Sequence, residues 1–227
     1  EEAVRWFRLA ADKGHADAQH SLGLCYQNAA AARKAKARQG DIAAAARAKY
    51  GHLSQAKKDT QLWNDSFDGK LEEVEWLVAA GANPRFTDEK YGATPLYRAA
   101  YNGHQEIVVL LLENKADSTA RDANGWSPLH GSAYKGYVEI VAALIEAKAE
   151  VNAKDQEENT PLHFAAGWGS TTLIELLLCN SANPLLRNKN GRTPVQIAAR
   201  LGRNENVSLL DRWSRPMDDS NEDTLFS

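Results

Sequence analysis

One phrase occurs four times along the chain, as Thr94-Pro95-Leu96-Tyr97, Ser127-Pro128-Leu129-His130, Thr160-Pro161-Leu162-His163 and Thr193-Pro194-Val195-Gln196. The prolines of successive phrases are separated by 33 residues each time. Self-similarity at such a period is typical of stacked supersecondary units rather than of one globular core. The functional question is therefore what an elongated surface binds.

Each Thr-Pro or Ser-Pro pair predicts the start of a short helix. The hydroxyl can accept a hydrogen bond from a free amide of the first turn, and proline suits the first helical position. A second, apolar helix is expected to follow in each unit, as at residues 107–112. Each first helix is expected to end at a glycine in the left-handed conformation, at Gly103, Gly136, Gly169 and Gly202.

These segments resemble ankyrin repeats over residues 60–211, in about five units of which the first and last are degenerate. The resemblance implies an all-α fold, an α-solenoid of stacked helix-turn-helix units. The first unit, around Gly69, lacks a Thr-Pro start, as expected of a terminal capping repeat. In the last unit Asn206 and Asp211 stand where earlier units have apolar residues, which predicts the end of the stack.

The sequence departs from the family pattern at positions that favour glycine. If these residues adopt positive φ, each costs ~1 kcal/mol, so the array is expected to be less stable than an idealised one. The residues concerned are Lys115, Lys148, Glu158 and Ser181.

Residues 1–28 carry a different pattern of small and aromatic residues, with Trp6-Phe7, Leu22-Gly23 and Tyr26 spaced as in an antiparallel helix pair. This segment resembles a Sel-one-like repeat, a relative of the tetratricopeptide repeat. Residues 29–59 are rich in alanine and basic residues and predict a helical connector with a break at Gly40. Residues 212–227 form an acidic tail that is expected to be mobile unless a partner orders it.

The basic connector leaves two interpretations open. It is either a solvated connecting helix or a surface for nucleic acid or an anionic membrane. The connector lacks interleaved aromatic residues for base stacking, and the whole chain has a formal net charge of −3. Both observations favour the connecting helix.

Composition and cysteine usage suit a cytoplasmic or another reducing intracellular compartment. No apolar run approaches the roughly 20 residues that span a bilayer, and no apolar secretory leader is present. Cys25 and Cys179 are expected to be small helix-packing residues rather than a disulfide. The chain opens at Glu1 rather than methionine. This leaves open the interpretation that it is a fragment or a processed form that has lost an address signal.

The sequence predicts no catalytic residue, no cofactor and no metal site. His130 and His163 fall at the family's framework histidine, where the ring braces a turn, and His104 follows a closing glycine. No histidine pair has helix-face ligand spacing with a carboxylate, and no cysteine pair supports zinc. Neither a nucleophile elbow nor a glycine-rich phosphate loop is present. We therefore expect a protein that is not an enzyme.

The ankyrin resemblance implies that partner contact runs along the concave face. It places aromatic residues there that the framework does not require, and such residues often anchor protein interfaces. The predicted function is a protein-protein interaction scaffold or adaptor. The alternatives are a structural subunit docked in a larger complex through the connector and tail, and nucleic-acid binding through the connector. The predicted partner-binding residues are Phe67, Tyr91, Tyr101, Asn102, Trp126, Tyr134, Lys135, Trp168 and Arg200.

Overall fold

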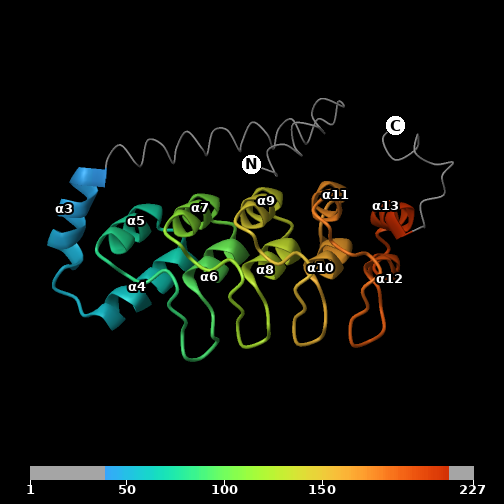
Figure 1. Cartoon of the computed structure of the whole chain (residues 1–227), viewed down its shortest axis with the longest axis horizontal. Coiled ribbons are helices and arrows are strands. Elements are labelled where there is room, and N and C mark those ends of the chain that lie inside the picture. Colours follow the sequence, from blue (N-terminus) through green and yellow to red (C-terminus); the bar gives the residue numbers. More distant parts are fainter. Residues whose placement is uncertain (1–38, 215–227) are drawn as a thin grey trace, which may run out of the picture.

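The computed structural model describes residues 39–214 (Figure 1). The predicted Sel-one-like pair at residues 1–28, the connector up to residue 38 and the tail from residue 215 lie outside this range. Within residues 39–214 the chain is helical and contains no strand, as the sequence predicts. The helices are α3 (Gln39–Tyr50), α4 (Gln55–Asp68), α5 (Leu71–Ala79), α6 (Pro95–Asn102), α7 (Gln105–Glu113), α8 (Pro128–Lys135), α9 (Val138–Glu146), α10 (Pro161–Trp168), α11 (Thr171–Cys179), α12 (Pro194–Arg200) and α13 (Asn204–Ser214).

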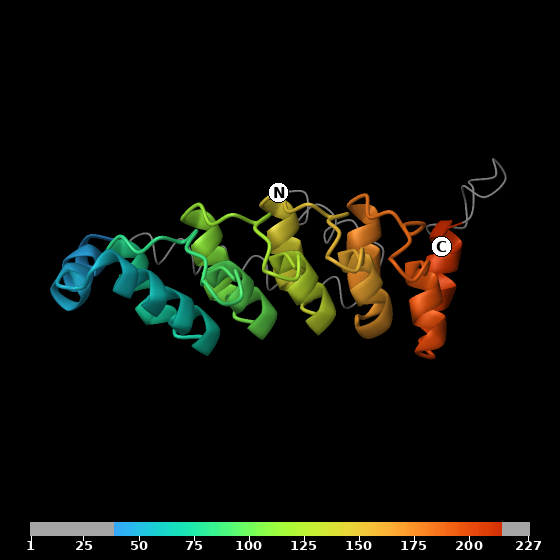
Figure 2. The ribbon, with the colours of Figure 1, turned by 90° about the horizontal axis from the view of Figure 1, so that it is seen from below.

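The helices form pairs that stack side by side in two rows (Figures 1 and 2). Helices α4, α6, α8, α10 and α12 form the inner row, in which each helix contacts its neighbours. Helices α5, α7, α9, α11 and α13 form the outer row in the same way. Helix α3 contacts α5 and so takes the place of an outer helix ahead of the first pair. This arrangement is the α-solenoid that the repeated phrase predicts.

The Thr-Pro phrase starts an inner helix in each of its four units, as predicted. In α6 the Thr94 hydroxyl accepts from the Tyr97 amide at 3.1 Å. In α12 the bond runs the other way, because the Thr193 amide donates to Oε1 of Gln196 at 3.0 Å. Both bonds satisfy an amide that the first turn of a helix leaves without a partner.

Three of the four glycines predicted to close the inner helices have positive φ, namely Gly103, Gly136 and Gly202. The prediction is wrong at Gly169, which is extended with φ −85° and ψ 172°. The cause lies in the next residue, since the Ser170 hydroxyl accepts from the Leu173 amide at 3.2 Å and caps α11. The chain enters α11 through this cap instead of through a left-handed glycine.

The four non-glycine residues expected at positive φ do adopt it. Their φ angles lie close to the left-handed minimum that glycine occupies without steric cost. The values are 64° at Lys115, 65° at Lys148, 59° at Glu158 and 67° at Ser181.

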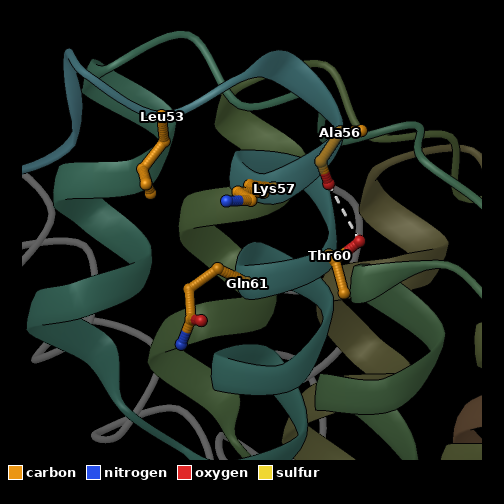
Figure 3. A pocket seen from close by; sticks show the side chains of 5 residues that line it. All are labelled: Leu53, Ala56, Lys57, Thr60 and Gln61. Atoms are coloured by element: carbon orange, nitrogen blue, oxygen red, sulfur yellow. Dashed lines mark hydrogen bonds between the residues drawn. The ribbon is translucent and has the colours of Figure 1, made fainter.

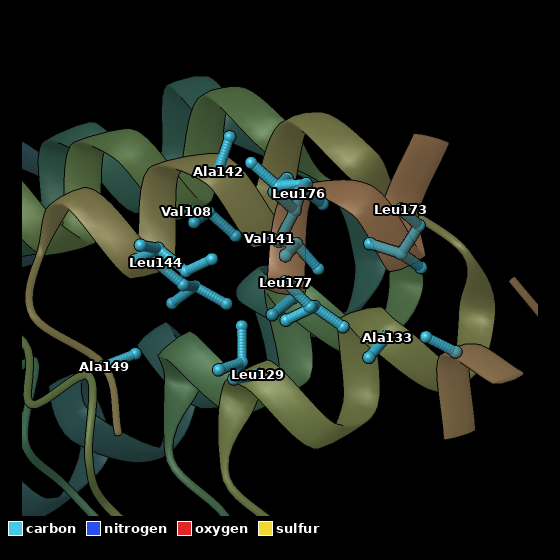
Figure 4. Close-up of a cluster of buried hydrophobic side chains, with 14 of the residues drawn as sticks. Val108, Leu129, Ala133, Val141, Ala142, Leu144, Ala149, Leu173, Leu176 and Leu177 are labelled. Atoms are coloured by element: carbon cyan, nitrogen blue, oxygen red, sulfur yellow. The ribbon is translucent and has the colours of Figure 1, made fainter. Parts of the chain in front are cut away.

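A single apolar core runs between the two rows of helices (Figure 4). Leu129 from α8, Leu144 from α9 and Leu177 from α11 are fully buried in it. Each helix pair thus buries its apolar face against its neighbours and not only within itself, which is how repeat arrays gain stability.

Asn206 in α13 is buried, although a polar residue at this position suggested that the stack ends here. Its Nδ2 donates to the carbonyl oxygens of Ala166 at 3.1 Å and Gly169 at 3.2 Å. Asp211, the other polar replacement, is exposed. Within residues 39–214 the stack ends with α13.

Candidate functional site

The candidate site is the inner face, which we define as the exposed surface of the inner helices together with the loops that join successive pairs (Figure 1). The loops lie in a row on one side of the inner helices (Figure 1). Their backbones are hydrogen-bonded to one another, with the Ala123 amide 2.7 Å from the Tyr91 oxygen and the Gln156 amide 3.0 Å from the Asn124 oxygen. The loops therefore form one continuous edge.

An aspartate or asparagine at the start of the turn within each loop holds that turn. The Asp122 carboxylate accepts from the amides of Asn124 and Trp126, each at 2.8 Å. A side chain that accepts hydrogen bonds from two backbone amides of its own loop fixes the turn locally. The equivalent residues in the other loops are Asp88, Asp155 and Asn188.

Aromatic rings gather on the inner helices α6, α8 and α10. The ring centroids of Tyr97 and Tyr101 are 5.9 Å apart, those of Tyr101 and Tyr134 6.4 Å, and those of Tyr134 and Trp168 5.2 Å. Gly131 makes room for this arrangement, since a Cβ there would lie 3.3 Å from the Tyr101 ring. These separations are typical of favourable ring contacts.

Trp126 and Phe164 pack against this cluster. Their centroids are 4.6 Å apart, and each also contacts Tyr134, at 5.7 and 5.9 Å respectively. Phe164 is buried and Trp126 is partly buried against the core. Phe164 was not predicted; its signal in the sequence is an aromatic residue at the fourth position of an inner helix.

Arg98 is a second site residue that the sequence did not indicate. Its guanidinium carbon lies 3.9 Å from the Phe67 ring centroid and 4.2 Å from that of Trp63. Nε of Arg98 is buried and has no hydrogen-bond partner among the described residues. Desolvation by burial lowers the pKa of Arg98. The contact joins the inner helices α4 and α6.

Lys135 on α8 repeats the pairing of a cation with aromatic rings. Its Nζ lies 4.7 Å from the Tyr101 centroid and 5.7 Å from that of Tyr134. Such contacts attract the cation to the face of the ring. On the inner helices, Arg98 and Lys135 are thus both positioned by aromatic side chains.

All nine predicted partner-binding residues lie on inner helices or in the loops between pairs. The structure brings Tyr101, Tyr134 and Trp168 into one series of ring contacts, whereas Phe67 contacts Arg98 instead. Asn102 donates from Nδ2 to the Arg98 oxygen at 2.7 Å. Five of the nine are exposed, namely Phe67, Tyr91, Lys135, Trp168 and Arg200; four are partly buried, namely Tyr101, Asn102, Trp126 and Tyr134.

The two framework histidines have the structural role that the sequence predicts. Nδ1 of His130 accepts from the Ser127 amide at 3.1 Å, and its Nε2 lies 3.1 Å from the Asn159 oxygen in the next unit. His163 makes the same two contacts one repeat later. Burial lowers the pKa of His130 to about 4 and also lowers that of His163. Both rings are therefore held neutral at physiological pH.

Cys179 corrects a prediction. It was expected to pack between helices, but it is exposed at the last residue of α11. The buried stripe of that helix includes Leu173, Leu176 and Leu177, and Cys179 falls outside it. Cys25 lies outside the described residues. Across residues 39–214, no group of three or more His, Cys, Asp or Glu side chains is arranged to hold a metal ion.

A shallow hollow of about 380 Å³ lies at the α3 end of the stack (Figure 3). One face of α4 lines it with Ala56, Lys57, Thr60 and Gln61, and Leu53 closes one side. The Thr60 hydroxyl donates to the Ala56 oxygen at 2.8 Å and is thus satisfied within the helix. The hollow is the end surface of the inner row and is separate from the inner face.

Two basic residues of the predicted connector are used inside the fold. Nζ of Lys49 on α3 pairs with Glu73 at 2.7 Å, and it lies 4.4 Å from the Trp76 ring centroid. Nζ of Lys58 on α4 donates to the Ala80 oxygen at 3.0 Å. The Lys49 contacts join the connector to α5, and the Lys58 contact joins it to the turn that follows α5. These two cations therefore stabilise the packing of the first repeat.

None of the helices in residues 39–214 combines the length and the apolar character that a membrane crossing requires. Residues 65–155 and 149–213 match the family model for ankyrin repeats (3 copies). A stretch of 52 residues, 23% of this chain, is 42% identical to the human 2-5A-dependent ribonuclease and spans 7% of that protein's length. The repeated caps, the two rows of helices and the family match agree, and the chain belongs to the ankyrin-repeat family.

Proposed function

We propose that this protein is a non-catalytic scaffold or adaptor that binds a protein partner along the inner face. Ankyrin repeats generally mediate protein-protein interaction. The observation that carries the proposal is the exposure of large aromatic side chains on this face. Phe67 is 40% exposed, Tyr91 47% and Trp168 48%. Tyrosine, tryptophan and arginine are the side chains that most often dominate interface energetics.

For Trp168, contacts with neighbouring rings favour a role in binding over chance exposure. Trp168 contacts Tyr134 and Phe164, so its ring is held in place before a partner arrives. A side chain that is ordered in advance loses less entropy on binding. Leu71, another exposed apolar residue, lies on the outer helix α5.

The test compares the wild-type chain with a Tyr134→Ala/Trp168→Ala variant in affinity capture from native extract. We expect the wild-type chain to retain a protein that the double variant loses, because truncating two anchors weakens an interface by ~2 kcal/mol or more each. Thermal unfolding establishes that the variant is folded, since Tyr134 is partly buried.

Trp213→Ala is the matched control, because it removes an exposed tryptophan from the outer helix α13. It should leave capture unchanged. Equal capture by the wild type and the folded double variant contradicts binding along the inner face.

A further inference from the structure

We propose that the inner face recognises an acidic segment of a protein partner. Arg98 binds a carboxylate of that segment, and the surface formed by Trp168 and Leu201 accepts one of its apolar side chains. The inference rests on the proposed function and specifies the partner's chemistry.

The guanidinium of Arg98 is positioned but not hydrogen-bonded. The rings of Phe67 and Trp63 hold it, and the described residues offer its side-chain nitrogens neither a hydrogen bond nor an ion pair within 4.0 Å. A guanidinium carries five N–H donors in a planar fork that matches a carboxylate with two parallel bonds. A partly desolvated guanidinium without acceptors favours such a ligand.

The two carboxylates whose charges act on Arg98, Asp68 and Asp88, are engaged elsewhere. Asp68 pairs with Lys70 at 2.7 Å. Asp88 accepts from the amides of Tyr91 and Ala93 at 2.9 and 2.8 Å, which fixes its loop. Both raise the pKa of Arg98 through their charge, but neither lies within ion-pair distance of it. Neither of these two carboxylates is therefore available to pair with Arg98.

Lys135 extends the positive surface along the same face. Its side chain is exposed over the rings of Tyr101 and Tyr134, and no carboxylate among the described residues pairs with it. Two unpaired cations on neighbouring inner helices, α6 and α8, favour a segment with more than one acidic residue.

The other end of the inner face is apolar. Trp168 on α10 is 48% exposed, and Leu201, which follows α12, is 45% exposed. Each residue immediately precedes the glycine that follows the inner helix of its unit, so the two occupy the same register. The Leu201 side chain also lies against Gly167, where a Cβ would meet it at 2.9 Å. An apolar side chain of the partner would cover this surface.

The stacking sets the distance between the two contacts. Helices α6 and α10 are two positions apart in the inner row, and packed helices lie about 8–10 Å apart, so the separation is about 16–20 Å. An extended chain covers this distance with about five or six residues at ~3.3 Å each. The partner segment should therefore carry an Asp or Glu about this far from an apolar residue.

The experiment selects random displayed peptides on the full chain and measures the affinity of the enriched peptides by fluorescence anisotropy. We expect enriched peptides with an acidic residue and an apolar residue at this spacing. Arg98→Gln should weaken their binding about tenfold or more. Arg98→Lys keeps the charge but loses the planar fork, so its loss should be smaller. The affinity should also fall as salt screens the cations.

Arg212→Gln is the matched control, because it makes the same charge change on the outer helix α13, and it should leave the affinity unchanged. Enriched peptides without acidic residues, or binding that folded Arg98→Gln leaves intact, overturn the inference. If Tyr134→Ala/Trp168→Ala still abolishes binding of the enriched peptides, the proposed function stands and only the acidic character of the partner is refuted. Binding that survives both variants overturns both proposals. Arg98-dependent binding of single-stranded RNA, without peptide binding, overturns the inference in favour of nucleic acid.

Discussion

His130 and His163 each connect one repeat to the next through a single buried ring. One nitrogen accepts from the helix-capping residue of the same unit, and the other bonds a carbonyl oxygen of the following loop. Protonation would remove the acceptor and place a charge in a buried site. The neutral ring is therefore a requirement of the fold.

We predict that the free energy of unfolding falls as the pH drops from 7 to 5. The pKa of His130 is about 4 in the folded chain and ~6.5 when unfolded, so between these values the unfolded state binds more protons. At pH 5 this costs ~2 kcal/mol for His130 alone, and His163 adds to it in the same direction. Urea unfolding at several pH values measures the slope.

A His130→Gln/His163→Gln variant should lose most of this pH dependence. Glutamine is a suitable replacement because Gln196 occupies the position of His130 and His163 in the last unit. There its Oε1 accepts a hydrogen bond from the Thr193 amide. The carboxyls whose pKa is lowered, such as Glu73 and Glu158, titrate below this window. A variant as pH-dependent as the wild type would refute the assignment to the histidines.

The left-handed residue Lys115 predicts a gain in stability on substitution. Lys115→Gly removes the steric cost of positive φ, ~1–2 kcal/mol, and adds ~0.5–1 kcal/mol of chain entropy to the unfolded state. We expect a net increase of ~0.5 kcal/mol in the free energy of unfolding, measured by denaturant unfolding. Lys115→Ala keeps the strain and should show no gain; an equal gain from alanine would contradict the explanation.

The turn between α10 and α11 shows how one element depends on another. Because Ser170 caps α11 and Gly169 is extended, the carbonyls of Ala166 and Gly169 accept from Asn206 of α13. The polar residue that seemed to mark a degenerate repeat is therefore a partner for the irregular turn of its neighbour.

Asn206→Leu should destabilise the protein by ~1–3 kcal/mol, even though the other units carry an apolar residue here. The substitution removes the donor that Asn206 Nδ2 provides to two carbonyl oxygens. Thermal or denaturant unfolding gives the change. Ser208→Ala, on an exposed site of the same helix, should stay within ~0.5 kcal/mol. A neutral or stabilised Asn206→Leu variant would show that the two bonds contribute nothing.

At the scale of the molecule, each interior pair has neighbours on both sides and each terminal pair on one side only. Stability in such arrays is approximately a sum of unit and interface contributions. Amide hydrogen exchange should therefore be slowest in α8–α11 and fastest in α3 and α13. Leu144→Ala, at a fully buried site in α9, should cost ~2–5 kcal/mol and accelerate exchange in both neighbouring pairs. Acceleration confined to α9 would contradict this coupling.

The sequence alone determined the period, the helix pairs and the strained positions. Regular spacing of Thr-Pro caps and glycines specifies each unit locally. The four positive-φ residues that replace glycine could be predicted because each depends only on its own position in the repeat. The same reasoning located the nine candidate partner-binding residues on the inner helices and loops. Their role in binding stays a prediction.

Only the tertiary structure decided which side chains meet between units. The contacts of Arg98 with Phe67 and Trp63 and of Asn206 with Gly169 join residues more than 30 positions apart. No local propensity encodes such pairs, since they depend on how neighbouring helices are placed against one another. The extended backbone of Gly169 was missed for a related reason, because a serine cap in the next helix overrode the preference of a glycine for the left-handed conformation.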